Sequence, residues 1–328
     1  MIGLLRSFVF SISTDEASFV KRGFAAQQAS RQNHLEHCAS SFIVGYNAAL
    51  RVSDLEELSA QLAGVDLPSR GFAYEGAGMG FALLDGLNPI RCVRGSPRFS
   101  RFLQGCGSDH LYMAHVGVGW AVARLPWIHR KLDSYVQQFD PLLRWLVYDG
   151  YGFHQGFFQS ARFVESMKKP QGLSHYGGRA FDQGLGRCLW FVHGGDVEAV
   201  VGKISRVALE RRADLFSGVG LAITYAGGAD ANADAAELLR ERADSFRWNV
   251  AQGAAFAAKA RQRARNMTQH TETACHILCG CSADESAGIT DQCLVNLKLS
   301  SKEPAYEVWR TRIATAIEIS ESHASLRQ

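Results

Sequence analysis

The run QGLGRC, residues 183–188, recurs in altered form along much of the chain, and its spacing decides the fold. The related runs are EGAGMG at 75–80, HVGVGW at 115–120, DGYGFH at 149–154, SGVGLA at 217–222 and QGAAFA at 252–257. The first glycines of the six runs lie 41, 33, 34, 34 and 35 residues apart. A near-constant period in this range is typical of helical repeat arrays, so the sequence predicts about six repeats of roughly 34 residues.

Each period has room for two helical segments joined by a short turn. Residues 174–193 carry QGLGRC and are followed by the turn HGGD and a second segment at 196–209, for which Asp196 is a suitable N-cap. The next period predicts helices at 212–225 and 232–246. Turns this short favour antiparallel neighbours. We therefore expect an all-α, curved array of helical hairpins, either an open solenoid like a tetratricopeptide array or a closed α/α toroid.

The segments outside the array are expected to cap it within one continuous domain. Residues 1–66 form the expected N-terminal helical cap, with a helix at 35–62. Residues 67–269 form the repeat array, and residues 270–328 form the C-terminal helical cap, with a helix at 306–319. Glycine costs about 1 kcal/mol in a helix interior relative to alanine. Its recurrence in every motif therefore indicates that successive helix backbones approach closely.

Two positions of the motif, one before and three after the first glycine, share a helix face because they are four residues apart. The pairs are Glu75/Met79, Val116/Trp120, Asp149/Phe153, Gln183/Arg187, Ser217/Leu221 and Gln252/Phe256. The position six after the first glycine, which is Trp190 in the fourth motif and Lys259 in the sixth, extends this face. If the array curves, the stripe lines a largely apolar cavity with a few charged groups, which is the usual character of a small-molecule site.

Four residues are candidate catalytic groups: Glu75, Asp149, His154 and Asp182. Glu75 and Asp149 occupy the same motif position, and two carboxylates in an apolar cavity can have pKa values far enough apart to give an acid and a base. His154 replaces a small residue in its motif and is a candidate general acid or base. The alternatives are an ion pair or a helix N-terminus for each acid, and a core position for the histidine.

Further residues on or near these faces are candidates for substrate binding. They are His115, Trp120, Phe153, Arg187, Trp190, Asp214, Phe256, Lys259 and Arg263. Lys259 and Arg263 lie about one helical turn apart and suit a phosphate, a carboxylate or a phosphopantetheine arm. A solvated basic helix end would have the same pattern.

Composition and motifs exclude several classes of function. The formal net charge of the 328 residues is +3, which is too weak to indicate a nucleic-acid partner. The chain has no uncharged apolar run long enough for a membrane span and no signal-peptide pattern, so a cytoplasmic protein is expected. It also has no P-loop, nucleophile elbow or zinc-protease motif. We predict no cofactor.

One cysteine-rich run needs a separate interpretation. His270, Cys275, His276, Cys279 and Cys281 include thiolate and imidazole groups, which are natural zinc ligands. Cys275 and Cys279 share one face of a predicted helix, and cysteine packs as a small apolar residue. We predict core packing and no metal, with metal binding as the alternative.

Six runs of the chain resemble the UnbL-type family, whose members occur in enediyne polyketide biosynthetic clusters and whose reaction is unassigned. The resemblance extends from about Phe8 to Trp309. It is carried by GFAYEGAGMGFALLDGL at 71–87, YMAHVGVGWAVARL at 112–125, DPLLRWLVYDGYGFHQGFF at 140–158, RAFDQGLGRCLWFVHGGD at 179–196, RRADLFSGVGLAITYAGG at 211–228 and AQGAAFAAKARQRARN at 251–266. The resemblance implies a bacterial polyketide or polyene pathway and assigns no catalytic residue.

These features favour an enzyme of secondary metabolism that cyclises or isomerises a hydrophobic, polyene-like intermediate. Glu75 or Asp149 would donate the proton, and Arg187 and Lys259 would anchor a polar head. A terpene-like cyclase is a variant of this hypothesis, although its usual Asp-rich motif is missing. The alternative is a non-catalytic helical scaffold that binds a polyketide synthase, a carrier protein or a reactive product. An enzyme should enclose a dry pocket, whereas a scaffold should present an open groove.

Overall fold

The computed structural model describes residues 2–25, 28–52, 54–87, 97–228, 232–297 and 303–325. Within those ranges every regular element is a helix and no β-strand is present, so the all-α prediction is confirmed. The longer helices are α1 (Ile2–Phe10), α3 (Ala29–Arg51), α4 (Leu55–Ala63), α5 (Arg70–Gly86), α7 (Pro97–Gln104), α8 (Leu111–Arg124), α11 (Trp145–Phe158), α12 (His175–Val192), α13 (Val197–Ile204), α14 (Leu209–Tyr225), α15 (Asn232–Arg242), α16 (Arg247–Ala264), α17 (Gln269–Cys279), α18 (Ala283–Leu294) and α19 (Ala305–Ser325). The short helical turns are η1 (Thr14–Ala17), α2 (Phe19–Arg22), η2 (Ser108–His110), α9 (Pro126–His129), α10 (Leu132–Tyr135), η3 (Val136–Gln138), the π-helical η4 (Ala161–Glu165) and η5 (Asp244–Phe246).

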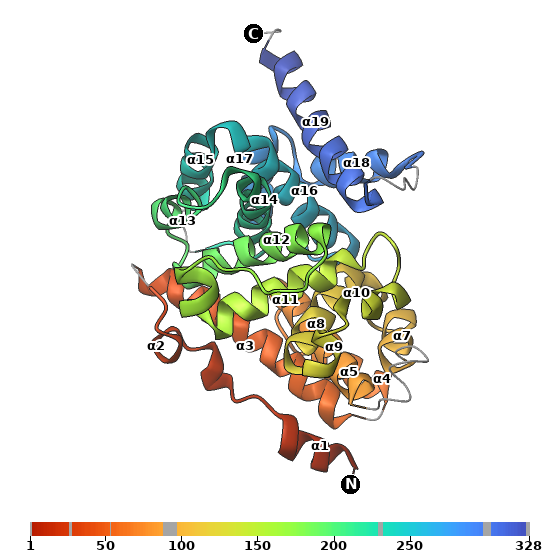
Figure 1. Cartoon of the computed structure of the whole chain (residues 1–328). Helices are drawn as coiled ribbons and strands as arrows, with labels where there is room; N and C mark the ends of the chain where they lie inside the picture. The colour runs from red at the N-terminus through yellow and green to blue at the C-terminus, as the bar shows by residue number, and fades with distance from the viewer. Residues whose placement is uncertain are drawn as a thin grey trace.

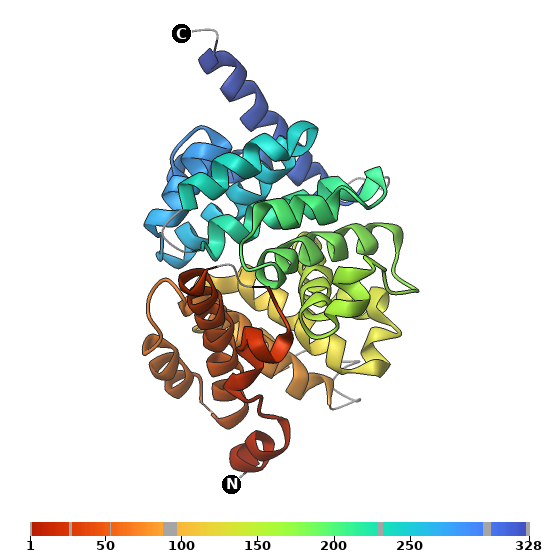
Figure 2. The same cartoon turned by 90° about the vertical axis from the view of Figure 1, so that its left-hand side faces the viewer.

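Six helices, α5, α8, α11, α12, α14 and α16, carry the glycine motifs and pack side by side in chain order (Figures 1 and 2). They run in the same direction, because residues one repeat apart are neighbours. Ser217 Oγ donates a 2.7 Å hydrogen bond to Gln252 Oε1, and the carbonyl oxygen of Tyr225 accepts one from Arg261. The connecting helices α13 and α15 pack on each other. The predicted repeat array is therefore the observed architecture.

The motif glycines lie where neighbouring helix backbones touch. A Cβ atom at Gly184 would overlap the carbonyl oxygen of Asp149 on the preceding helix, and one at Gly186 would overlap that of Leu215 on the following helix. The same relation joins Gly117 to Glu75, Gly150 to Val116, Gly218 to Gln183, Gly253 to Ser217, Gly78 to Ala114, Gly119 to Val147, Gly152 to Phe181 and Gly220 to Val250. The prediction of close backbone approach is confirmed.

Helix α3 joins this stack although it lies in the stretch expected to cap it. A Cβ atom at Gly45 would overlap the carbonyl oxygen of Ala73, and one at Gly76 would overlap that of Phe42. Ile43 stands where the other motifs have their first glycine, 33 residues before Gly76. The array's contact geometry thus begins one helix earlier than the glycine pattern indicates.

The single helix expected at 35–62 is wrong, because the structure has two helices there. Helix α3 ends at Arg51, and α4 begins at Leu55 with Asp54 as its N-cap, accepting a hydrogen bond from the backbone of Glu56 at 3.3 Å. The N-cap predicted at Asp196 is confirmed: its carboxylate accepts a hydrogen bond from the backbone N–H of Ala199 at 3.1 Å.

The two ends of the array meet. Tyr225, at the end of α14, packs on Phe72, near the start of α5, with ring centroids 5.3 Å apart. Arg261 of α16 donates a 3.2 Å hydrogen bond to the carbonyl oxygen of Pro68, just before α5. The array therefore closes on itself at this end, which favours the toroid over the open solenoid.

The C-terminal helices cover the last array helix. Helices α17, α18 and α19 all pack on α16, and the C-terminal part of α19 projects beyond the body of the molecule in both views (Figures 1 and 2). Among the residues that the structure describes, no helix combines the length and the apolar character needed to cross a membrane.

Candidate functional site

Three charged side chains from three array helices meet inside the ring. They are Glu75 of α5, Asp149 of α11 and Arg187 of α12, and all are almost completely buried. Arg187 Nη1 lies 2.5 Å from Asp149 Oδ1, and Nη2 lies 3.8 Å from Glu75 Oε2. One guanidinium therefore faces two carboxyl groups. We refer to these three residues as the Glu75–Arg187–Asp149 cluster.

The repeat geometry explains these pairings. The residue three after the first glycine of one motif reaches the residue one before the first glycine of the preceding motif. Trp120 Nε1 donates a 3.0 Å hydrogen bond to Glu75 Oε1 by this relation, and Arg187 binds Asp149 by the same relation two repeats later. A single structural rule thus holds both carboxyl groups in place.

Burial raises the pKa of Glu75 from 4.5 to about 7. Arg187 opposes this shift, Asp149 adds to it through like-charge repulsion, and the hydrogen bond from Trp120 opposes it. Burial lowers the pKa of Arg187, but Asp149 and Glu75 raise it further, to above its usual value. The cluster is therefore electrically neutral when Glu75 is protonated and carries one net negative charge when Glu75 is ionised.

Two residues that sequence reasoning did not select complete the cluster. Gln183 Nε2 donates hydrogen bonds to Asp149 Oδ2 at 2.9 Å and to the hydroxyl of Tyr306 at 3.1 Å. Gln183 belongs to the polar stripe, so its position was a usable signal. Tyr306 comes from α19, far along the chain and outside the repeat, and no local pattern marks it.

Two small cavities adjoin the cluster, and Arg187 lines both. Glu75 faces the first cavity and Asp149 the second. Cavity 1 is lined by Ile12, Glu16, Cys38, Ala39, Phe42, Ile43, Phe72, Glu75, Trp120, Phe153, Phe157, Phe158, Arg187 and Phe191. Cavity 2 is lined by Tyr112, Met113, Val116, Leu146, Asp149, Arg187, Leu221, Tyr225, Phe256, Ala257, Lys259, Ala260, Tyr306 and Trp309. Both have the apolar walls and the few charged groups that are typical of small-molecule sites.

The structure brings seven of the predicted site residues to these cavities. They are Glu75, Trp120, Phe153, Asp149, Arg187, Phe256 and Lys259. The two predicted carboxylates do not share one cavity, because the Arg187 side chain lies between them. Arg187 and Lys259 line only cavity 2 together, so the expected anchoring of a polar head group by both residues concerns cavity 2 alone.

A family model described as "Protein of unknown function (DUF1702)" matches residues 1–317. The chain belongs to this family. No curated protein and no solved structure matches the chain. The matched range contains the whole repeat array and reaches into α19, so the Glu75–Arg187–Asp149 cluster, Gln183 and Tyr306 all lie within the family's domain.

Neither of the two predicted histidines, His115 and His154, is among the described residues that line the cavities. His154 packs between Trp120 and Phe158, and burial together with Arg124 lowers its pKa to about 3. His115 is buried and its Nδ1 hydrogen-bonds the carbonyl oxygen of Leu111 at 2.7 Å. Burial lowers its pKa as well. Both are neutral core histidines at pH 7, which was the alternative interpretation of the sequence.

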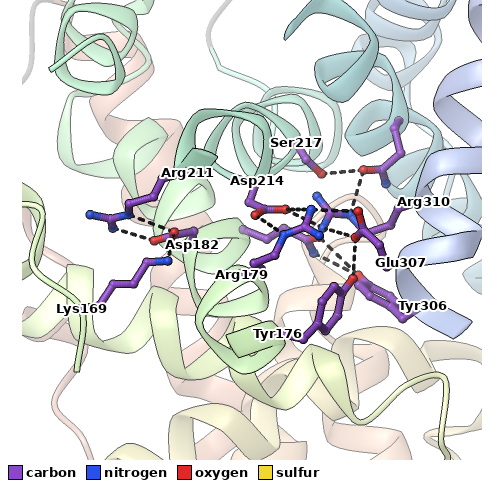
Figure 3. Close-up of polar contacts among 12 residues, drawn as sticks. Lys169, Tyr176, Arg179, Asp182, Arg211, Asp214, Ser217, Tyr306, Glu307 and Arg310 are labelled. Atoms are coloured by element: carbon purple, nitrogen blue, oxygen red, sulfur yellow. Dashed lines mark hydrogen bonds and ion pairs between the residues drawn. The ribbon is translucent and has the colours of Figure 1, made fainter. Parts of the chain in front are cut away.

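The predicted acids Asp182 and Asp214 are buried and are not among the described residues that line either cavity. Figure 3 shows their ion pairs. Arg211 and Lys169 bind Asp182, with Nη2–Oδ1 and Nζ–Oδ2 distances of 2.7 and 2.5 Å. Asp214 accepts from Arg179 Nε at 2.9 Å and from Arg310 Nη1 at 2.7 Å. Burial alone would raise the pKa of Asp214, but Arg310 and Arg179 lower it below its usual value. Each acid is thus an ion-pair partner.

Trp190 and Arg263 also make structural contacts. Trp190 Nε1 donates a 2.8 Å hydrogen bond to the carbonyl oxygen of Gly227, and Arg263 Nε and Nη2 donate to that of Ser108 at 3.2 and 3.1 Å. Arg263 is not among the described residues that line the cavity of Lys259.

The cysteine-rich run is largely part of the core of the C-terminal helices. Cys275 and Cys279 are buried in α17, and Cys279 Sγ donates to the carbonyl oxygen of Ala251 at 3.3 Å. Over the described part of the chain, no group of three or more His, Cys, Asp or Glu side chains has an arrangement that could hold a metal ion. The described residues thus give no support to the metal alternative.

Proposed function

We propose that this protein is an enzyme that isomerises or cyclises an unsaturated, apolar substrate in cavity 1, with Glu75 transferring the proton. The observation that carries this proposal is the Glu75 carboxyl, whose pKa is raised to about 7 in a cavity with otherwise almost entirely apolar walls. A carboxyl poised near neutral pH exists in both protonation states, which is the requirement for a general acid that must also act as a base.

The chemistry needs only a proton and the substrate's own electrons. Protonated Glu75 adds its proton to one carbon of a conjugated chain, and the π bond supplies the electron pair for the new C–H bond. The substrate becomes an allylic cation and Glu75 a carboxylate. The carboxylate then removes a proton from another carbon, which forms a new double bond and regenerates the acid. Attack by a second double bond before this step closes a ring. Substrate and product are isomers.

The walls of cavity 1 suit a cationic intermediate. The Trp120 ring lies 4.4 Å from that of Phe42 and 5.2 Å from that of Phe153, centroid to centroid, and these rings are cavity walls. Aromatic faces attract cations. The cluster gains one negative charge at the moment the substrate gains a positive one, so proton transfer creates an attractive pair in a water-poor site.

Arg187 and Asp149 act on Glu75 from the opposite side. Arg187 interacts more strongly with Asp149 than with Glu75, because its nitrogen atoms lie 2.5 Å from Asp149 and 3.8 Å from Glu75. Glu75 therefore keeps a raised pKa despite a neighbouring cation. Asp149 lines cavity 2, so we assign it the role of positioning Arg187 and not of touching the substrate.

The proposed substrate is a polyene or polyketide-derived intermediate of bacterial secondary metabolism, because the chain resembles proteins of enediyne clusters. A polyketide synthase or its carrier protein would supply it. Apolar cavities that adjoin a buried carboxyl favour an enzyme over a scaffold, which would present an open polar groove.

The test is deuterium transfer. The hydrocarbon released by a polyene-producing bacterial polyketide synthase, expressed without this protein, is incubated with the purified protein in D₂O, and the products are analysed by mass spectrometry. We expect an isomeric product carrying deuterium, formed about 10²–10⁴-fold more slowly by Glu75→Gln. Asp182→Asn, a buried acid away from both cavities, is the control and should retain the activity of its folded fraction. Equal deuterium transfer by folded Glu75→Gln would refute the proposal.

A further inference from the structure

Cavity 2 is separate from the proposed reaction site and has its own opening. Its half-buried lining residues, Tyr112, Leu221 and Lys259, mark a mouth on helices α8, α14 and α16. The half-buried residues of cavity 1, Glu16, Ala39 and Phe158, lie on other elements. Between the two cavities stands Arg187, which a substrate in cavity 1 contacts from the other side. The proposed proton transfer by Glu75 does not use cavity 2.

The walls of cavity 2 suit a flat or extended apolar group. Phe256 packs against Trp309 and Tyr306 of α19, with ring centroids 4.6 and 5.7 Å apart. The Tyr306 hydroxyl is engaged by Gln183, so its ring, and not a free polar group, faces the cavity. Helix α19 thus provides one aromatic wall of this cavity.

A cation stands at the mouth. The Lys259 side chain is 15% exposed, and its Nζ lies 2.6 Å from Asp291 Oδ2 and 3.2 Å from Gln262 Oε1. Asp291 is itself 52% exposed, so it is a surface carboxylate that a ligand's own anion can replace. At the inner end, Arg187 is already paired with Asp149, which leaves Lys259 as the cation available to an incoming anion among the described lining residues.

We propose that cavity 2 is a second ligand-binding site, for a small amphipathic anion whose apolar body fills the aromatic-walled cavity and whose carboxylate or similar group pairs with Lys259. The class includes aromatic acids and short acyl chains ending in an acid. Bound there, the ligand contacts Arg187 and Asp149 from the side opposite to Glu75. Such a ligand is a second substrate or an effector, distinct from the hydrocarbon in cavity 1.

Two fluorescent probes that share one ring system and differ by a sulfonate group test this site in the full-length protein. They are N-phenyl-1-naphthylamine, which is neutral, and its sulfonate analogue 8-anilinonaphthalene-1-sulfonate. We expect two equivalents of the neutral probe to bind the wild type. Ala39→Trp, at the mouth of cavity 1, and Leu221→Trp, at the mouth of cavity 2, should each remove one equivalent. The remaining equivalent in each variant shows that the variant is folded.

The charge at the mouth is tested by two opposed variants. Lys259→Met should lower the affinity of cavity 2 for the sulfonate probe about tenfold, which is the range of one charge-assisted hydrogen bond. The affinity for the neutral probe should not change. Asp291→Asn removes the competing carboxylate and should raise the affinity for the sulfonate probe. An equal effect of Lys259→Met on both probes would overturn the anionic specificity.

The proposal of a second site would be wrong if the wild type bound only one equivalent of the neutral probe, and if Ala39→Trp abolished that binding while Leu221→Trp did not. That result is distinguishable from failure of the proposed function, which is read from the Glu75 dependence of deuterium transfer in cavity 1.

Discussion

Arg187 lies closer to Asp149 than to Glu75, with nitrogen–oxygen distances of 2.5 and 3.8 Å, although it faces both carboxyl groups inside the ring. Burial raises the pKa of Glu75 from 4.5 to about 7, and Arg187 opposes this rise only in part. A buried cation equally shared between the two acids would stabilise the Glu75 carboxylate more strongly. The proton on Glu75 at neutral pH therefore depends first on burial and second on the pairing of Arg187 with Asp149.

The raised pKa of Glu75 makes stability depend on pH in a defined direction. The folded protein holds the Glu75 proton up to about pH 7, whereas the unfolded chain loses it near 4.5. Between these values the folded state binds more protons, so this group's contribution is present below 4.5 and is lost as the pH rises through 7. The full shift corresponds to about 3 kcal/mol.

We expect the difference in unfolding free energy between wild type and Glu75→Gln to change by about 3 kcal/mol from pH 5 to pH 8, to the disadvantage of the wild type at pH 8. Urea unfolding at both pH values measures it. The comparison of two variants cancels the contributions of other titrating groups. A difference that does not change with pH would mean that Glu75 titrates normally.

Buried His154 should affect stability with the opposite sign. Its pKa is lowered to about 3 in the folded protein, from 6.5, so the unfolded state binds the additional proton as the pH falls. Stability is therefore retained above pH 6.5 and decreases below it, by up to about 1.4 kcal/mol per pH unit. His154→Gln should flatten the acid limb of a stability–pH curve measured by urea unfolding. An unchanged slope between pH 6.5 and 4 would contradict the core assignment of this histidine.

The close backbone contacts predict an asymmetric response to glycine substitution. Gly184→Ala places a methyl group against the carbonyl oxygen of Asp149 and should destabilise the protein by about 3 kcal/mol, because two backbones must separate. Gly202→Ala, in α13 with no atom near the new methyl group, should stabilise it by up to about 1 kcal/mol. Thermal unfolding compares them. Equal effects of the two substitutions would show that the glycines do not control helix approach.

The buried arginine of α19 should be costly to remove. Arg310 is paired with Asp214 and Glu307, and its Nε also donates to Gln252 at 3.2 Å (Figure 3). Arg310→Met leaves Asp214 with one cation fewer and should destabilise the protein by about 3–5 kcal/mol. Arg312→Met, on the exposed side of the same helix, is the control and should change stability by less than about 1 kcal/mol. Comparable losses in both variants would contradict a special contribution of the buried Arg310 ion pairs to stability.

The sequence predicted the array and half of the site because both follow from one motif. Glu75, Asp149 and Arg187 were found from their shared positions in the glycine runs. Helix α3 was not recognised as part of the stack, because Ile43 replaces the first glycine and only Gly45 keeps the contact.

The remaining differences between the sequence predictions and the structure concern long-range pairing. Asp182 lies one residue from the stripe and looked like a catalytic acid, but Arg211 and Lys169 bind it on the other side of α12. No local sequence pattern predicts which arginine of a neighbouring helix will pair with a given acid. Tyr306 was missed for the same reason, because α19 reaches the cluster only through tertiary packing.

The central claim is that Glu75 holds a transferable proton at neutral pH, and carbon-13 NMR of the glutamate side-chain carboxyl groups tests it most directly. We predict one carboxyl resonance in the wild type that titrates near pH 7, is absent from Glu75→Gln, and persists in the control Asp182→Asn. If every glutamate carboxyl titrates below about pH 5.5, within the ordinary range for this side chain, then Glu75 is a permanent carboxylate and cannot donate the proton.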